Sequence, residues 1–334
     1  MIIDIYNHFM PKLFLERLAE LVPSHVAVKA FPRLNTLWDI DARLRLLDRF
    51  PDYQQVLSLA NPPLELIAGP DATPALARLA NDGLAELCRR YPERFPAFIA
   101  SLPMNHIPAC LEEIERTVGG LGARGVQVFT NVAGVPLSAP QFRPIFQRMK
   151  ALDLPVWIHP IRGPDFPDYT SETGSEAEIW FSFGWPYETT AAVTRLIYSG
   201  IYDELPGLKI VTHHMGGMIP YYAGKIDLGF SQIFFGTTER NPAAEKAGLK
   251  LKPREYYRML YADTALNGNI AATRCGHDFF GTDHCLFATD APFDAEQGQW
   301  LINGTMSAVG ALETGAADLA AIRTANARRL LHLG

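Results

Sequence analysis

The feature that most constrains this sequence is a regular alternation of short β-rich runs with longer segments of helical periodicity. Eight such runs occur, and Leu, Ile and Ala recur every three or four positions in the segments between them. The expected strands are 2–9, 54–60, 95–103, 125–130, 155–160, 209–214, 259–265 and 285–293, and the expected helices include 75–92, 109–119, 140–152, 188–203 and 316–332. Eight strands joined by helical crossovers predict an α/β fold, a closed (β/α)8 TIM barrel.

Two connections are longer than a simple crossover requires. Residues 11–53 separate the first two expected strands, and residues 161–187 follow the fifth. Connections of this length usually carry structure or function of their own. We therefore expect a small insertion at 11–53 and a lid loop at 161–187 over the barrel mouth, within a single domain that spans residues 1–334.

Composition excludes several classes of protein. The chain is 48% hydrophobic and 20% charged with a formal net charge of −6, so it offers no basic face to nucleic acid. No stretch approaches the roughly 20 uninterrupted apolar residues of a membrane span, and the first ten residues lack the basic start of a signal peptide. The four cysteines lack CxxC spacing, which is typical of reduced thiols. We therefore expect a cytoplasmic protein that acts on a small molecule.

Polar side chains gather at the ends of the expected strands. In a parallel barrel the carboxyl ends of the strands surround one axis, and the loops that follow them build the active face. The residues at these ends are Tyr6, Asn7 and His8 on the first strand, His159 on the fifth, His213 and His214 on the sixth, and Asp290 on the eighth. Because side chains alternate along a strand, we expect only one of His213 and His214 to face the axis easily.

These residue types suit a divalent metal ion. Imidazole and carboxylate groups bind zinc or a similar borderline ion, and a catalytic site commonly uses three protein ligands and leaves a position open. Taken alone, each residue has a structural explanation, such as a hydrogen-bonded histidine or a turn-forming aspartate. Their combination on four strands favours a metal site built from His8, His159, His214 and Asp290.

Several longer blocks resemble a known family. They include "SLPMNHIPACLEEIERTVGGLGARGVQVFTN", "PVWIHP", "GWPYETTAAVTRLIYSGIYDELPGLKIVTHHMGGMIPYYAGKIDLGFS", "LYADTA" and "FATDAPF". In this order they resemble the aminocarboxymuconate-semialdehyde decarboxylase branch of the amidohydrolase superfamily. The resemblance covers nearly the whole chain, and the segment 184–231 is its most specific part.

The resemblance implies a (β/α)8 barrel with one divalent metal ion, usually zinc and in some members manganese. The first strand of the family reads Asp-x-His-x-His or Asp-x-Glu-x-His, and both later positions bind the metal. Carried onto this chain, the ligands are His8, His159 and Asp290. His214 matches a histidine that stays just off the metal and acts as an acid or base.

Tyr6 is the main departure, because it stands where the family has its first ligand. A neutral phenol is a poor ligand for a divalent ion at pH 7. Tyr6 either binds as phenolate, or donates a hydrogen bond to the substrate while the other three residues hold the metal, or belongs to a metal-free site such as that of a related lactonase group. We favour the second alternative, in which Tyr6 is a catalytic-site residue without a metal bond, since three protein ligands suffice for a catalytic zinc.

An anionic, planar substrate requires cations and aromatic rings in the pocket. The resemblance places Lys225 where the decarboxylases carry an arginine for the substrate carboxylate, and Arg33 and Arg162 are further candidates. Lysine lacks the planar fork of arginine, so it does not secure a bidentate grip. The candidates for stacking on the substrate are Trp180, Phe181 and Trp185. Packing within a long loop is an equally good explanation of these three aromatic residues.

The sequence therefore predicts a metal-dependent, non-oxidative decarboxylase of a small aromatic or unsaturated carboxylic acid. His214 would supply the proton that the substrate carbon needs before carbon dioxide leaves, and Asp290 would serve as ligand and proton partner. Two alternatives stay open: a hydrolase or hydratase that uses a metal-activated water, and a non-catalytic binding barrel that has lost its first ligand. The apolar segment 218–235 predicts a homodimer.

Overall fold

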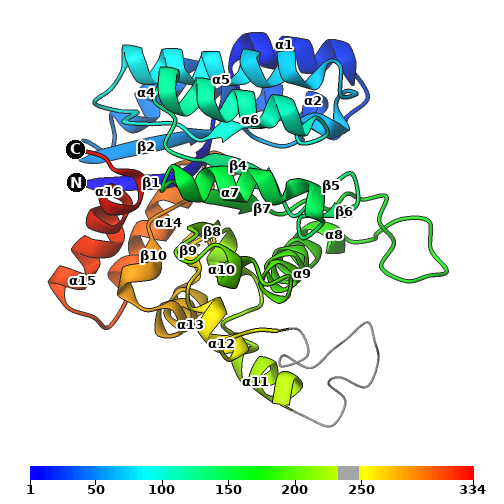
Figure 1. Ribbon diagram of the computed structural model, residues 1–334. Helices are drawn as coiled ribbons and strands as arrows, with labels where there is room; N and C mark the ends of the chain where they lie inside the picture. Colours follow the sequence, from blue (N-terminus) through cyan, green and yellow to red (C-terminus); the bar gives the residue numbers. More distant parts are fainter. Residues whose placement is uncertain (232–247) are drawn as a thin grey trace.

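The computed structural model describes residues 1–231 and 248–334, and within them it shows a barrel of parallel strands surrounded by helices (Figure 1). The barrel strands are β1 (Ile2–His8), β2 (Tyr53–Ser58), β3 (Ala100–Ser101), β4 (Val126–Phe129), β7 (Val156–His159), β8 (Ile210–Thr212), β9 (Tyr261–Asp263) and β10 (Cys285–Leu286). Seven lie inside ranges expected from the sequence, and β2 begins one residue before its expected range of 54–60. The predicted barrel is confirmed.

The barrel closes through backbone hydrogen bonds between strands that lie far apart in sequence. Six strands pair in the order β10-β9-β8-β7-β4-β3, and β1 pairs with β2. The amide of Ile99 donates to the carbonyl of Leu57 at 2.8 Å, which joins β2 to the β3 segment. The amide of Ile5 donates to the carbonyl of Phe287 at 2.9 Å, which joins β1 to β10. The carboxyl ends of all these strands therefore meet on one face.

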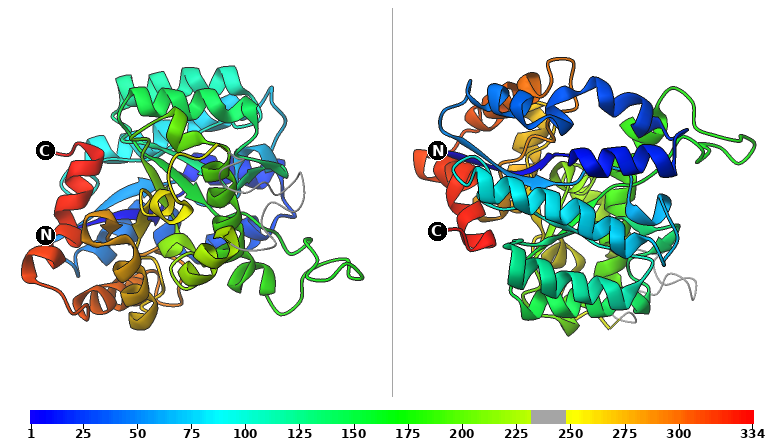
Figure 2. Two further views of the ribbon diagram at one scale, coloured as in Figure 1. Left: turned by 60° about the horizontal axis from the view of Figure 1, so that its bottom comes forward. Right: turned by 90° about the horizontal axis from the view of Figure 1, so that it is seen from above.

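Helices cover the outside of the barrel (Figure 2). Those that follow β2 and the later strands are α5 (Thr73–Arg90), α6 (Ile107–Arg116), α7 (Arg143–Ala151), α9 (Gly184–Tyr198), α10 (Ile201–Glu204), α12 (Pro253–Tyr257), α13 (Ile270–Phe280), α14 (Gln299–Gly310), α15 (Ala316–Ala320) and α16 (Asn326–Leu331). The expected helix 188–203 is divided into α9 and α10, because Gly200 between them has a φ of 76°. A left-handed residue of this kind ends a helix, and glycine adopts it without strain. Among the described helices, none has the length and apolar character that crossing a bilayer requires.

The long connection after β1 forms short helices that pack beside the barrel. They are α1 (Lys12–Leu21), α2 (Val26–Ala30), the 3-10 turn η1 (Phe31–Arg33), α3 (Asn35–Trp38) and α4 (Ile40–Leu47). The connection therefore carries structure of its own, as its length predicts. Its last helix, α4, places a buried arginine behind the first strand.

The connection after β7 only partly covers the barrel mouth. It contains the short helix α8 (Ile179–Ser182), and the loop before α8 extends away from the body of the molecule (Figures 1 and 2). Its end, at the start of α9, brings Trp185 against two histidines of the strand ends. The segment 218–235, which we expect to form a dimer contact, includes α11 (Ala223–Ser231) and continues into residues outside the described ranges.

Apolar side chains fill the barrel below the polar strand ends. Most come from the strands or the few residues beside them, and α16 adds Ala327, Leu330 and Leu331 at the end where both chain termini lie (Figure 1). The cluster members on the strands or close to their ends are Ile3, Ile5, Tyr6, Val56, Ala97, Ile99, Trp157, Val211, Ala265, Leu286 and Ala288. Burial of apolar surface stabilises the fold by about 25 cal/mol per Å². The barrel interior is thus a packed core with a polar site at one end.

Candidate active site

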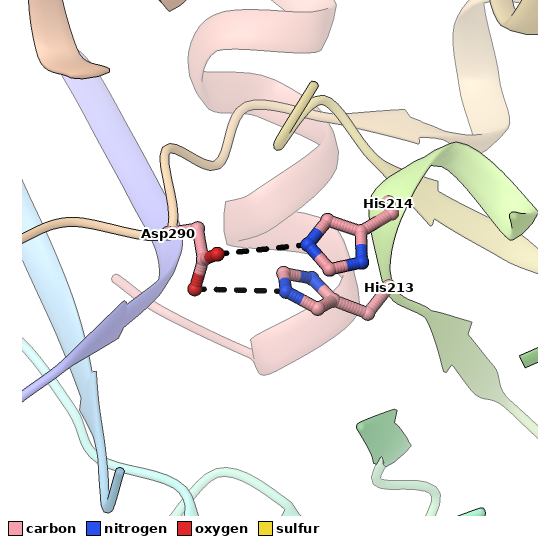
Figure 3. Close-up of side chains that lie close together, drawn as sticks. All are labelled: His213, His214 and Asp290. Carbon is pink, nitrogen blue, oxygen red and sulfur yellow. Dashed lines mark ion pairs between the residues drawn. The ribbon is translucent and has the colours of Figure 1, made fainter. Parts of the chain in front are cut away.

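Three side chains form a compact group at the carboxyl ends of β8 and β10. His213, His214 and Asp290 each offer a donor atom, and these atoms lie within 4.8 Å of one another. The two imidazoles lie on the same side of Asp290, and each is directed at a different carboxylate oxygen (Figure 3). Nε2 of His213 is 3.6 Å from Oδ1, and Nε2 of His214 is 3.5 Å from Oδ2.

His8 joins this group from β1. Its Nε2 lies 3.0 Å from Oδ1 of Asp290, the same oxygen that faces His213. Its Nδ1 lies 3.2 Å from the carbonyl oxygen of Leu59 and 3.1 Å from Oγ of Ser58, whose hydroxyl donates to the carbonyl of Asn7. Both neighbours therefore accept from Nδ1–H, which leaves Nε2 as the basic atom of the ring. The ring is oriented as a metal-binding histidine is.

His159 enters the site from β7 as a neutral ring. Its Nδ1 donates to the carbonyl of Pro160 at 2.6 Å, so Nε2 is free to accept or to bind a metal. Burial, together with the electrostatic influence of the neighbouring His213 and His8, holds the pKa of His159 well below its usual value. The ring centroid lies 5.5 Å from that of His8 and 5.3 Å from that of His213. The expected ligand His159 therefore borders the cluster through ring contacts.

The expectation that only one of His213 and His214 faces the axis is wrong. Strand β8 ends at Thr212, and the chain then turns: His214 and Met215 have φ values of 51° and 52°. Side-chain alternation holds only while the backbone stays extended. Because the strand ends before the pair, both imidazoles reach Asp290.

Asp263, at the end of β9, holds His213 in place. Its Oδ2 lies 2.5 Å from Nδ1 of His213, and both side chains are almost fully buried. Burial alone lowers the pKa of His213, but the carboxylates of Asp263 and Asp290 outweigh it and raise this pKa to about 9. Sequence reasoning missed Asp263. The signal was present, because Asp263 ends the seventh barrel strand just as Asp290 follows the eighth.

His214 and Asp290 lie nearer the opening than His213 does. Their side chains are 16% and 15% exposed, against 1% for His213. Burial, followed by the charge of His213, lowers the pKa of His214. Burial opposes ionisation of Asp290, but hydrogen bonds and charge from the three histidines around it hold its pKa well below the usual value. The carboxylate is therefore ionised, with neighbouring rings ready to exchange a proton.

Tyr6 is fully buried beside these rings. Its hydroxyl donates to Oε1 of Gln127 at 2.7 Å, and its ring centroid lies 4.5 Å from that of His213 and 4.9 Å from that of His8. Burial raises the pKa of Tyr6 well above its usual value, and the charges of Asp290 and Asp263 raise it further. The phenol is thus protonated, and its hydroxyl donates to Gln127 on β4. Sequence reasoning missed Gln127.

A buried carboxylate ties the first and last strands together beneath the site. Asp4 accepts hydrogen bonds from the amide and hydroxyl of Thr289, at 3.2 and 2.7 Å, and from the hydroxyl of Tyr53 at 2.6 Å. Burial raises the pKa of Asp4 to about 6, against the effect of these donors, so the group is ionised at pH 7. Asp4 therefore fixes the residue that precedes Asp290.

A buried guanidinium fixes His8 from behind. Arg43 of α4 donates to the carbonyl of His8 at 2.5 Å, to the carbonyl of Thr36 at 2.7 Å and to Oε1 of Gln55 at 2.8 Å. Burial lowers the pKa of Arg43 to about 10, which still leaves it charged at pH 7. The insertion after β1 therefore supports the site, a role that its sequence does not reveal.

The expected aromatic residues gather at the mouth. Trp185 lies 5.4 Å from His159 and 6.4 Å from His214 between ring centroids, and its Nε1 donates to the carbonyl of Arg162. Trp180 and Phe181 pack on Trp185 at 5.9 and 4.8 Å. Only Trp185 of the three contacts the histidines, within the part of the chain that the structure describes.

The expected cations lie outside the cluster. Arg162 pairs with Glu188 at 3.4 Å and lies over the ring of Phe166 at 4.1 Å. Arg33 is exposed on η1, whose Phe31 packs on Phe293, and Phe293 packs on His8. Lys225 is exposed on α11 and, among the described residues, forms no hydrogen bond or ion pair with the cluster. Of these three, Arg162 has the most direct link to the site, because its carbonyl accepts from Trp185, which contacts His159 and His214.

The closed barrel and the buried His–Asp group at the carboxyl ends of its strands together define an enzyme of the (β/α)8 class. The amidohydrolase family model matches residues 3–333, so the chain belongs to the amidohydrolase family. The expected superfamily is thereby confirmed.

The most similar relatives include decarboxylases. The chain is 31% identical to gamma-resorcylate decarboxylase of Rhizobium sp. (strain MTP-10005), over 99% of this chain and 98% of the relative. It is also 31% identical to 2-amino-3-carboxymuconate-6-semialdehyde decarboxylase of Dictyostelium discoideum, over 77% of this chain and 67% of the relative. The resemblance to the decarboxylase branch of the superfamily is thus confirmed.

A solved structure of a related enzyme is similar over almost the whole chain. The dihydroxybenzoic acid decarboxylase of Polaromonas sp. JS666, with bound manganese and the inhibitor 2-nitroresorcinol, superposes with a TM-score of 0.79 at 30% identity. The match covers 99% of this chain and 96% of the other. This similarity supports the fold.

Proposed function

We propose that the protein is a metal-dependent, non-oxidative decarboxylase of a small aromatic carboxylic acid. The observation that carries the proposal is the approach of His8 and His214 to the two oxygens of Asp290, with His159 beside them, at the active end of the barrel. The named activities of the relatives support the same reaction class. The substrate class follows from the dihydroxybenzoic acid decarboxylase and its aromatic inhibitor.

The site fits a divalent cation. Nε2 of His213 and Nδ1 of His214 are buried and have no hydrogen-bond partner among the described residues, and Asp290 is ionised beside them. Nε2 of His213 faces Oδ1 of Asp290 at 3.6 Å, and a buried imidazole nitrogen without a partner beside a carboxylate suits a borderline ion. We propose His8, His159 and Asp290 as ligands. The imidazole-rich set favours zinc, and the manganese of the Polaromonas enzyme makes that ion the second candidate.

The protein residues perform the proton transfer. A bound divalent ion would hold the substrate carboxylate and its adjacent oxygen and stabilise the developing charge. We assign proton delivery to His214, because its ring lies near the mouth and contacts Asp290. The carbon that bears the carboxylate gains this proton, the carbon–carbon bond breaks, its electrons return to the ring, and carbon dioxide leaves. A lowered pKa makes the His214 imidazolium a stronger acid toward that carbon.

Trp185 forms the wall against which a planar substrate would stack, because its ring borders both His159 and His214. Arg162 and Arg33 are the cations that we propose for the substrate's outer polar groups, since both lie beside aromatic residues that lead to the cluster. Oligomeric state is a separate proposal: exposed Tyr221 and Leu228, at 79% and 57%, support a homodimer through the region of α11.

The function is tested by incubating the purified protein with carboxyl-labelled 2,6-dihydroxybenzoate and measuring released label. We expect carbon dioxide release that a chelator abolishes and that added zinc or manganese restores. In deuterated water the product should carry one solvent deuteron at the former carboxyl position. A hydrolase would instead turn over an ester or lactone panel without carbon dioxide release.

Replacing Tyr6 with phenylalanine separates the alternatives for this residue. The variant loses the bond to Gln127, so we expect the free energy of unfolding to fall by about 1 to 2 kcal/mol. Metal affinity, measured by competition with a chromophoric chelator, should stay within about threefold, because a protonated phenol is no ligand. A large drop in affinity at unchanged fold would instead establish a phenolate ligand.

A further inference from the structure

We propose that His213 is a metal ligand and that it takes the place of the ligand absent at Tyr6. The inference rests on the proposed metal site and concerns how this chain completes it. The family resemblance implies ligands at positions 6, 8, 159 and 290, and only three of these positions hold a ligand side chain here. His213 supplies a further imidazole to the same pocket.

The geometry around Asp290 supports this assignment. Oδ1 of Asp290 lies 3.0 Å from Nε2 of His8 and 3.6 Å from Nε2 of His213. Two ligand atoms that bind one tetrahedral zinc at its usual bond lengths lie about 3.4 Å apart. Both separations are therefore close to those of atoms that share an ion. The ring of His213 also stacks on that of His159, with an interplanar angle of 25°.

His213 is also oriented as metal-binding histidines are. Its Nδ1 is held by the buried carboxylate of Asp263, and its buried Nε2 has no hydrogen-bond partner among the described residues. A carboxylate on the far nitrogen fixes the ring and increases its basicity toward a metal. Asp263 is thus a positioning residue that acts through His213.

The packing of Tyr6 is consistent with His213 as the replacement ligand. Its ring packs against His213 at 4.5 Å between centroids, and its hydroxyl is bound to Gln127 on the far side. The phenol fills the volume beside the site and leaves the coordinating position to the ring of His213. The ligand position that is lost at Tyr6 on the first strand is then supplied by His213 at the end of the sixth strand.

His214, the adjacent histidine, lacks these features. It has no carboxylate on its second nitrogen, it is more exposed, and its ring stacks near Trp185 at the mouth. These properties suit a group that meets the substrate. The inference therefore predicts opposite behaviour for two adjacent histidines: His213 determines metal affinity, and His214 determines turnover.

The test measures metal binding independently of activity. The wild-type protein and the His213→Gln, His214→Gln and Asp263→Asn variants are stripped of metal and titrated with zinc and manganese against a chromophoric chelator. We expect His213→Gln to lower affinity by more than about 100-fold and Asp263→Asn by about 10- to 100-fold, the range typical of groups that orient a ligand. His214→Gln should keep wild-type affinity. Wild-type affinity in His213→Gln overturns the inference.

Two further variants keep the test decisive if glutamine at 213 disturbs folding. His213→Cys loaded with cobalt(II) should show a sulfur-to-cobalt charge-transfer band in the near ultraviolet, which the wild-type protein lacks; cobalt bound without that band overturns the inference. Tyr6→His combined with His213→Ala should recover affinity lost in His213→Ala alone. If the wild-type protein itself binds no metal, the proposed function fails as well, and the two failures are thereby distinguished.

Discussion

Asp290→Asn is expected to reduce decarboxylation by about a thousandfold and to weaken metal binding while the protein stays folded. A divalent ion supplies several kcal/mol of charge stabilisation, and about 4 kcal/mol corresponds to about three powers of ten in rate. The variant keeps the size of the side chain but removes the negative charge that faces His8, His213 and His214. Steady-state kinetics and elemental analysis of the same preparation measure both effects.

The control for this variant is Asp283→Asn, because Asp283 is an exposed carboxylate on the turn before β10. We expect it to retain wild-type rate and metal content. Substantial turnover by Asp290→Asn without bound metal would contradict the proposed reaction and would favour a metal-free barrel.

Replacing Arg43 with methionine is expected to lower the free energy of unfolding by about 3 kcal/mol. The change leaves the carbonyls of Thr36 and His8 and the amide oxygen of Gln55 without their buried donor, and each unsatisfied group costs about 1–3 kcal/mol. Relief from burying a charge offsets part of this loss. Urea unfolding followed by circular dichroism measures the difference.

Arg45→Met is the matched control, since Arg45 is exposed on the same helix and should change stability by less than about 0.5 kcal/mol. Because Arg43 holds the backbone of His8, we also expect weaker metal binding in Arg43→Met. Unchanged stability in that variant would show that water or another group satisfies these acceptors.

The barrel was predictable because its signals are local. Each expected strand is a short β-rich run, and each helix repeats apolar residues with helical period, so neither depends on distant contacts. The exact ends of helices were harder to predict from the sequence. At Gly200, for example, one left-handed residue divides an expected helix into two. The lid was also only partly predictable: a loop's length says nothing of its direction, and only the end near Trp185 reaches the site.

The sequence predicts the site residues that lie at strand ends. It does not predict those whose position depends on a turn or on a hydrogen bond to a residue far away in the sequence. The strand-end rule places His8, His159, His214 and Asp290 in one neighbourhood, as observed. It fails for His213, because strand β8 stops one residue before it and side-chain alternation no longer applies. It also misses Arg43 and Gln127, whose roles arise from contacts far away in sequence.

The pairing of β1 with the segment of β10 determines when the pocket can form. His8 and Asp290 are 282 positions apart, and the β1–β10 hydrogen bonds bring them together only once both ends of the chain are available. A growing polypeptide therefore has no complete pocket until residue 290 has been synthesised and its strand has paired with β1. An ion that needs both His8 and Asp290 can bind fully only after that point.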